Sequence, residues 1–306
     1  MTGVRPDRTW LVAIAAAMWG TDGLLRKPLA DALPAATVVF WEHLLIVLLL
    51  SPWVPAAVRA FGRCTGRQRV AVLIVGGGCS ALATALFTMA FRLGDPVTPL
   101  VLQKLQPVIA VLAAFFLLRE RIRPSYLLFA LPALAGAWLL AFPEPFAVQV
   151  TALHAGLLAL GAATLWAAGT VLGRYLAGSL APREVTVLRF LIGLPAALII
   201  LLFQGDPIAV PLANLPALLL LALIPGLIGL TLYYIGLRST PAAKATLAEL
   251  AFPATAALIG VLVLDTALAG SQWLGFAIVL LAVTSLGWHD RVRKPTVRLA
   301  EVPADR

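Results

Sequence analysis

The sequence predicts an all-α integral membrane protein with ten transmembrane helices, arranged as two inverted repeats of five helices. The first reason is composition: 61% of the 306 residues are hydrophobic and only 12% are charged, with a mean hydropathy of +0.97, well above the level of soluble domains. The second is that long apolar stretches recur, separated by short polar gaps. The third is that the second half repeats the first. Because five is an odd number, the two halves must lie upside down relative to each other.

Ten stretches are apolar enough to cross a bilayer, which takes ~20 helical residues for a ~30 Å hydrocarbon core. They are 10–25, 34–50, 70–91, 96–118, 126–142, 155–176, 185–203, 215–237, 241–264 and 273–288. The first resembles a signal peptide, but Asp22, Arg26 and Lys27 follow it without a small-residue cleavage site, so we expect it to be retained. We assign residues 1–143 to the first repeat, 144–290 to the second and 291–306 to a disordered cytoplasmic tail.

Basic residues predict the orientation. Most of the 23 Lys and Arg residues, which give a net charge of +9, fall in alternate gaps and at the two ends. This distribution follows the positive-inside rule, so we expect a multi-pass protein of the cytoplasmic membrane with both termini cytoplasmic. Placement between apolar stretches argues against nucleic acid as a partner. The two cysteines, Cys64 and Cys79, form neither a disulfide framework nor a metal motif.

The internal repeat covers almost the whole chain. A shift of 147 residues aligns Trp19 with Trp166, and a shift of 146 aligns Arg92 with Arg238 and Pro107 with Pro253. Inverted repeats of this kind are the architecture of secondary transporters, whose substrate lies near the midplane between the halves.

Specific motifs then carry a family resemblance. They are AAMWGTDGLLRK in the first stretch, FTMAFR leading into Gly94-Asp95-Pro96, and LYYIGLRSTPAAKATLAELAFPATAALIG in the second half. The chain resembles an EamA-type transporter of the drug/metabolite transporter superfamily over essentially its whole length. This resemblance implies ten helices in two inverted repeats and the export of amino acids, other metabolites or drugs. One departure is that many members end the fourth helix of each half in glutamate, whereas here Glu120 has Asp265-Thr266 as its counterpart.

Charged residues inside the stretches are the first candidates for function, because burying a charge in a membrane is costly. Glu42 lies near the middle of its stretch, and Arg189 occupies the equivalent place in the second half. Lys104 and Glu249 each lie eight residues after the proline that opens their stretch, ~12 Å deep at ~1.5 Å per residue. We therefore expect two ion pairs, Glu42 with Lys104 and Arg189 with Glu249. They line a cavity or hold helices together.

Two prolines are candidate hinges. Pro107 and Pro253 cannot donate a hydrogen bond to the carbonyls four residues earlier, those of Gln103 and Glu249. Such free carbonyls are tolerated where the helix lines protein or a wet cavity. A packing kink without function is the alternative.

Aromatic and polar side chains complete the candidate substrate cavity. Large aromatics with polar tips suit an apolar or zwitterionic molecule, although core packing explains any one of them equally well. The predicted cavity residues are Trp19, Asp22, Trp41, Glu42, His43, Gln103, Lys104, Gln106, Arg189, Tyr233, Tyr234 and Glu249.

We therefore predict a secondary active transporter that exports a small amphipathic metabolite, such as an amino acid, by alternating access. Multidrug efflux and uptake by a permease of the same fold are alternatives. A membrane enzyme, a channel and a lipid scramblase are more remote, and no catalytic residue, metal site or cofactor is expected. The expected partners are the small-molecule substrate, membrane lipid and protons as the candidate coupling ion, and a homodimer is compatible with the sequence. Because no cation is evident at the depth of Asp22, this residue is the first candidate proton carrier and Glu42 the second.

Overall fold

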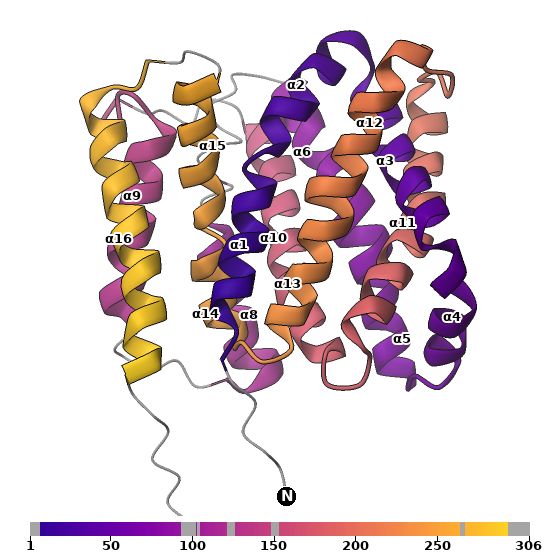
Figure 1. Ribbon diagram of the computed structural model, residues 1–306, viewed down its shortest axis with the longest axis horizontal. Helices are drawn as coiled ribbons and strands as arrows, with labels where there is room; N and C mark the ends of the chain where they lie inside the picture. Colours follow the sequence, from indigo (N-terminus) through magenta and orange to yellow (C-terminus); the bar gives the residue numbers. More distant parts are fainter. Residues whose placement is uncertain are drawn as a thin grey trace, which may run out of the picture.

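The computed structural model describes residues 7–92, 102, 105–120, 126–147, 153–263 and 267–292, where helices are joined by short turns and loops and no strand occurs. The helices (Figure 1) are α1 (Thr9–Trp19), α2 (Asp22–Ala32), α3 (Ala35–Leu50), η1 (Ser51–Trp53), α4 (Val54–Gly62), α5 (Gly66–Leu73), η2 (Ile74–Leu82), α6 (Ala83–Arg92), α8 (Gln106–Leu118), α9 (Leu127–Ala141), α10 (Leu153–Leu176), α11 (Pro182–Gln204), η4 (Leu212–Asn214), α12 (Leu215–Leu221), η5 (Ala222–Gly229), α13 (Leu230–Leu237), α14 (Ala242–Ala248), α15 (Ala251–Val263) and α16 (Gly270–Val292).

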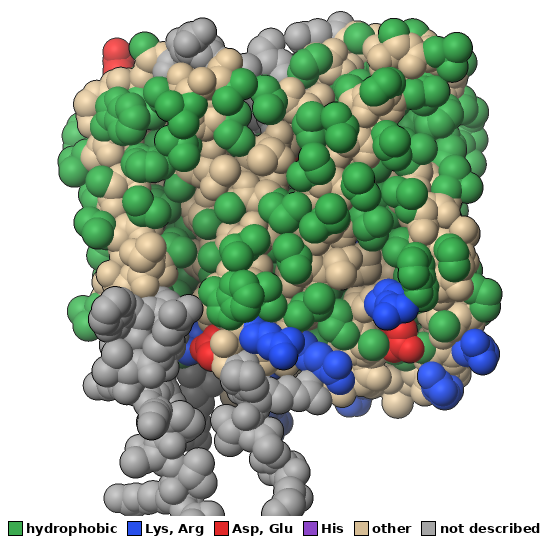
Figure 2. All heavy atoms as spheres, in the orientation of Figure 1, with side chains coloured by type: hydrophobic (Ala, Val, Ile, Leu, Met, Phe, Trp, Pro, Cys, Tyr) green, Lys and Arg blue, Asp and Glu red, His purple; other side chains and the backbone are tan. Residues whose placement is uncertain are grey.

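Helical length and composition confirm a multi-pass membrane protein. Six helical runs within the described residues are long and apolar enough to cross a membrane, and three shorter apolar helices overlap the predicted fourth, fifth and tenth stretches. The surface is apolar between the two ends of the molecule (Figure 2), with Leu128 74% and Phe116 72% exposed. Such side chains suit contact with lipid rather than with water.

The first predicted span is interrupted. Helix α1 ends at Trp19, and α2 begins at Asp22 after the two-residue turn Gly20-Thr21. A Cβ atom added to Gly20 would lie 2.6 Å from Thr255 Cβ, so the missing side chain lets α1 approach α15 closely. The second helix then carries Asp22 and Arg26, which the sequence had placed at the end of a continuous span.

The second predicted span extends beyond Leu50. A single 3₁₀ turn, η1, leads directly into α4, so helical structure runs from Ala35 to Gly62. Proline in the first turn of a helix is tolerated because its missing N–H would have no intrahelical acceptor there, and Pro52 and Pro55 occupy such positions.

The ninth predicted span is also interrupted, at Glu249-Leu250, between α14 and α15. Proline at 253 removes the donor that would bond the Glu249 carbonyl four residues back. Instead, the Phe252 N–H donates to the Glu249 carbonyl at 3.0 Å, and the Leu250 N–H donates to the Leu247 carbonyl at 3.1 Å. The turn tightens locally to 3₁₀ geometry, so the carbonyl that the sequence predicted to be free is satisfied by a neighbour.

Two π-helical segments, η2 and η5, lie in the predicted third and eighth spans. π-helical turns are frequent at functional sites because they open the regular hydrogen-bond ladder. Each segment offers a main-chain carbonyl to a side chain from another helix: Cys79 accepts from Arg189, and Pro225 accepts from Trp19.

Helices from the two halves of the chain pack against one another. Helix α9 pairs with α16 at one edge of the molecule (Figure 1), α3 and η2 pack on α11, α6 and α8 pack on α10, and α1 packs on α13 and α15. The core of small and aliphatic residues is therefore shared between the halves.

Candidate substrate and coupling site

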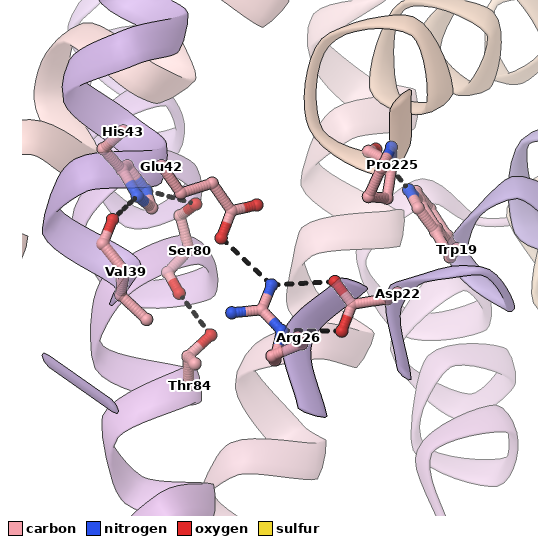
Figure 3. Close-up of polar contacts among 9 residues, drawn as sticks. All are labelled: Trp19, Asp22, Arg26, Val39, Glu42, His43, Ser80, Thr84 and Pro225. Atoms are coloured by element: carbon pink, nitrogen blue, oxygen red, sulfur yellow. Dashed lines mark hydrogen bonds and ion pairs between the residues drawn. The ribbon is translucent and has the colours of Figure 1, made fainter. Parts of the chain in front are cut away.

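The first polar cluster joins α2 to α3 around one guanidinium (Figure 3). Arg26 forms a two-point ion pair with Asp22 one helical turn earlier, with Nε at 2.6 Å from Oδ2 and a terminal nitrogen, Nη2, at 2.8 Å from Oδ1. The same terminal nitrogen lies 3.0 Å from Oε2 of Glu42. The side chains of Arg26 and Asp22 are 31% and 27% exposed, and that of Glu42 is 14% exposed. One cation thus binds two carboxylates at the edge of the helical core.

This cluster bears on two expectations. Lys104, the predicted partner of Glu42, lies outside the described residues, so that pair stays a prediction, and Glu42 is paired with Arg26. Asp22 was expected to lack a cation, but Arg26 holds it on both carboxylate oxygens. The sequence missed Arg26 because its stretch was taken to end at Leu25. In the structure, α2 continues and its guanidinium reaches across to α3.

His43, next to Glu42, occupies a position that suits packing (Figure 3). Its Nδ1 lies 2.8 Å from the Val39 carbonyl and its Nε2 lies 2.9 Å from Ser80 Oγ. Because a carbonyl only accepts, the proton belongs on Nδ1, which leaves Nε2 to accept from the hydroxyl. The ring also packs edge-on against Phe190. Both ring nitrogens are occupied, so His43 connects α3 to η2 rather than presenting a free nitrogen to a substrate.

The second polar cluster surrounds Glu249 at the break between α14 and α15. Tyr233 of α13 donates its hydroxyl to Oε1 at 2.7 Å, and Thr170 of α10 donates to the same oxygen at 3.0 Å. Gln106 of α8 donates from Nε2 to Oε2 at 3.4 Å. The carboxyl group is thereby held by neutral donors from three helices.

Arg189 does not form the predicted ion pair with Glu249. Its guanidinium donates to the Tyr234 hydroxyl at 3.0 Å and to the Cys79 carbonyl at 3.3 Å, while its Nε is buried without a hydrogen-bond partner. The prediction paired Arg189 with Glu249 only because both were expected at a similar depth in the membrane. In the structure the two terminal nitrogens of Arg189 bind the neighbouring π-helical carbonyl and a tyrosine instead.

Aromatic rings extend from the Glu249 cluster to Trp19. The rings of Trp19 and Tyr233 pack at a tilt of 46° with centroids 5.1 Å apart, and those of Tyr233 and Tyr234 pack edge to face with centroids 5.5 Å apart. The Trp19 indole N–H also donates to the Pro225 carbonyl at 3.1 Å (Figure 3). Trp41 is separate, since its indole N–H donates to the Ile208 carbonyl at 2.7 Å near a chain turn. The pair of Trp19 and Tyr233 therefore lies next to Glu249.

Of the other predicted cavity residues, Gln103 lies outside the described residues, as Lys104 does, and the hinge candidate Pro107 is buried at the start of α8. A small hollow lined by Ala36, Thr84 and Ala197 contains none of the charged groups. The polar clusters, rather than this hollow, define the candidate site.

A third polar junction, not predicted as a site, closes one end of the bundle. The carboxylate of Glu120 accepts from the Ala242 N–H at the start of α14 at 2.8 Å and lies 3.5 Å from Arg174 Nε. Arg174 in turn donates to the carbonyls of Leu237 and Arg238 that end α13. The sequence contained one sign of this junction, Glu120, which was interpreted only as a feature of the family.

At the same end, Asp7 binds Lys244 of α14 at 2.9 Å and accepts hydrogen bonds from Thr9. Desolvation acts to raise the pKa of Asp7. The hydrogen bonds from Thr9, together with the hydrogen bond and charge of Lys244, outweigh it, so the pKa lies below its usual range. Lys244 thereby ties α14 to the segment that precedes α1.

Comparison with known proteins identifies the family. The family model described as "EamA-like transporter family" matches this chain twice, over residues 9–142 and 154–288. The chain belongs to the EamA-like transporter family. The resemblance in the sequence motifs is thereby confirmed, and the protein is a membrane transporter.

Two curated relatives align with this EamA-like transporter over most of their length. "Riboflavin transporter ImpX" of Fusobacterium nucleatum subsp. nucleatum is 31% identical over 289 residues, covering 90% of this chain and 96% of the relative. "Uncharacterized transporter YwfM" of Bacillus subtilis is 30% identical over 290 residues, covering 92% and 94%. A crystal structure that is 21% identical superimposes with a TM-score of 0.74 over 94% of this chain and 99% of its own, which supports the fold alone.

Proposed function

We propose that this transporter moves a small amphipathic metabolite across the cytoplasmic membrane by alternating access, as a secondary active exporter. The observation that carries this proposal is the Glu249 cluster. A carboxyl group inside an apolar bundle is bound at once by side chains of α8, α10 and α13. Polar groups within membrane spans are costly and usually serve a pathway or binding site. A cluster that joins helices from both halves is well placed to respond when those halves move.

Helix packing supports alternating access of two inverted five-helix repeats. The contact between η2 and α11 has a counterpart in the contact between η5 and α3, and the contact of α6 with α10 has a counterpart in that of α13 with α1. The family model also matches the two halves separately. Inverted repeats that rock about a central site are a common mechanism of secondary transport.

The aromatic side chains favour a planar substrate with polar edges. The ring of Trp19 is partly exposed and packs against the buried ring of Tyr233, and Thr170 and Gln106 place hydrogen-bonding groups beside them. Aromatic rings with nearby polar atoms suit a flat, partly polar molecule. Riboflavin, named in the ImpX relative, has this chemistry and is the first substrate to test; an amino acid is the second. Multidrug efflux and uptake by a permease remain the alternatives that direction-resolved transport assays would distinguish.

The distribution of charge supports cytoplasmic termini. On the face shown in Figure 2, lysine and arginine side chains gather at the end of the molecule where the N-terminus lies. Basic ends facing the cytoplasm follow the positive-inside rule. Native Cys64 at this end is a poor reporter of topology because it is buried, and burial raises the pKa of its thiol. Introduced cysteines are therefore required.

Ligand stabilisation and counterflow test the proposal. Purified protein is screened by thermal unfolding against riboflavin and a metabolite library. A ligand at a hundredfold excess over its Kd adds about 2.7 kcal/mol to the free energy of unfolding. Trp19→Ala should abolish the shift, whereas Trp41→Ala, which removes a distant tryptophan, should preserve it. Saturable counterflow in proteoliposomes is the expected transport result; single-channel currents without counterflow would overturn the proposal.

A further inference from the structure

The position of Glu249 makes it different from the other acidic groups in the bundle. It lies eight residues after Pro241, ~12 Å along the helix, at a break in the chain direction between α14 and α15. Its two carboxylate oxygens accept from the side chains of Tyr233, Thr170 and Gln106, which come from three different helices.

The charges within the bundle are unevenly matched. Among the described residues, Arg26 is bound by both Asp22 and Glu42, and Arg189 is bound by a hydroxyl and a carbonyl. Among these same described residues, no lysine or arginine nitrogen lies within ion-pair distance of the Glu249 carboxylate. Of the three carboxyl groups of Asp22, Glu42 and Glu249, that of Glu249 has no guanidinium contact among the described residues.

We propose that Glu249 is the group that binds and releases the coupling proton. This inference rests on the proposed function, of which it specifies the energy source, and it replaces Asp22 as the carrier because Asp22 is tied to Arg26. A carboxyl group among neutral donors in an apolar bundle can take up a proton without breaking an ion pair. Neither Asp22 nor Glu42 offers this, since each would lose its contact with Arg26.

The hydrogen bonds supply the coupling. Ionised Glu249 accepts from three donors in charge-assisted hydrogen bonds, which are about twice as strong as neutral ones. A proton arriving from one aqueous side forms an O–H bond on the carboxylate and removes its charge, which weakens the attraction for Tyr233, Thr170 and Gln106. The helices α8, α10 and α13 are then free to separate. Release of the proton to the other side restores the carboxylate and the three contacts.

Other titratable or charged groups near Glu249 are few. Tyr233 faces it from α13, and Arg189 of α11 acts on it electrostatically without contact. Helix α1 packs against α14 and contributes no titratable side chain from Thr9 to Trp19. On α14 itself, Lys244 is paired with Asp7. Lys104, which precedes α8, lies outside the described residues, and the experiment therefore includes it.

Infrared difference spectroscopy of the purified protein tests this inference without any substrate. Acidification from about pH 8 to about pH 5, a range that spans strongly shifted carboxyl groups, should produce a protonated-carboxyl absorption. The band should disappear in Glu249→Gln and persist in Asp22→Asn. It should also persist in the matched control Glu120→Gln, which removes a carboxylate held by Arg174. Persistence of the band in Glu249→Gln, or its loss in Asp22→Asn, overturns the proposal.

Two further variants keep the test decisive. If Glu249→Gln fails to fold, Tyr233→Phe removes one donor to the carboxylate and should shift the midpoint of the band; an unchanged midpoint overturns the proposal. Lys104→Gln should leave the midpoint where it is, and a shift would place a lysine against Glu249.

Proteoliposomes separate this inference from the proposed function. Riboflavin counterflow requires only substrate exchange, so its absence in the wild-type protein counts against riboflavin transport and leaves the infrared result standing. Where counterflow occurs, the wild-type protein and the control Glu120→Gln should show a component driven by a pH gradient, and this component should be lost in Glu249→Gln. Retention of the pH-driven component in this variant overturns the assignment.

Discussion

The ion cluster of α2 and α3 gives a quantitative prediction, because its three members are not equivalent. Arg26 contacts both carboxylates, whereas the ion pair of Glu42 within the described residues is with Arg26 alone. Replacing Glu42 by Gln leaves the pair of Asp22 and Arg26 intact. Replacing Arg26 by Gln leaves two neighbouring carboxylates without a cation. We therefore expect Arg26→Gln to be clearly more destabilising than Glu42→Gln.

The distances set the magnitudes. Two unit charges 3.0 Å apart attract by about 5–6 kcal/mol at an effective dielectric constant of about 20, and partial exposure reduces this value. Loss of one partner of a buried pair costs ~3–5 kcal/mol. We expect Arg26→Gln to lower the free energy of unfolding by about 3–5 kcal/mol. For Glu42→Gln we expect a loss of about 1–2 kcal/mol, because Arg26 keeps its contact with the second carboxylate, that of Asp22.

A double-mutant cycle in detergent micelles, read by chemical unfolding, checks these values. The double variant should be destabilised by at least about 1 kcal/mol less than the sum of the single variants, as expected for groups in contact. Arg59→Gln is the matched control because this arginine is exposed and its side chain, among the described residues, bonds the Pro55 carbonyl rather than a carboxylate. Additive effects, or equal costs for the two single variants, would refute the reasoning. Coupling between Glu42→Gln and Lys104→Gln would support the pair of Glu42 with Lys104 that the sequence predicts.

Three further predictions concern other parts of the chain. In a background without native cysteines, a cysteine at Asp206 should react with an impermeant reagent added to intact cells, and one at Arg67 should not; the reverse pattern would invert the proposed topology. Gly193→Ala should lower the free energy of unfolding by about 1–3 kcal/mol, since an added Cβ would lie 2.7 Å from His43 Cδ2, and an unchanged unfolding curve would contradict the packing. Asp7→Asn should destabilise the protein at neutral pH, because the pKa of Asp7 is lowered in the folded protein. The ionised aspartate therefore stabilises the fold at pH values above its pKa in the unfolded chain. This deficit should vanish as the pH falls below about 4, so a deficit independent of pH would exclude the ion pair as its cause.

The membrane class and the approximate positions of the helices were predictable from the sequence. Hydrophobicity and stretch length are local properties, and a bilayer leaves helices as the simplest way to satisfy the backbone of a long apolar stretch. Local rules also predicted the disturbance at Glu249, since Pro253 cannot bond the carbonyl of that residue. The motifs around Trp19 and in the second half were sufficient to indicate the family.

The partners of the charges depended on the tertiary structure. Depth along a helix suggested Glu42 with Lys104 and Arg189 with Glu249, but depth does not fix how each helix is rotated. A break after Trp19 turned Arg26 toward Glu42, and a π-helical turn presented the Cys79 carbonyl to Arg189.

Such contacts depend on non-local packing, because hydrogen bonds and ion pairs require atoms to meet within about 3 Å. Two residues at the same level of a bundle can easily lie farther apart than that. The sequence therefore determined which stretches are apolar enough to form membrane-crossing helices, and only the packed helices decided which of their residues touch.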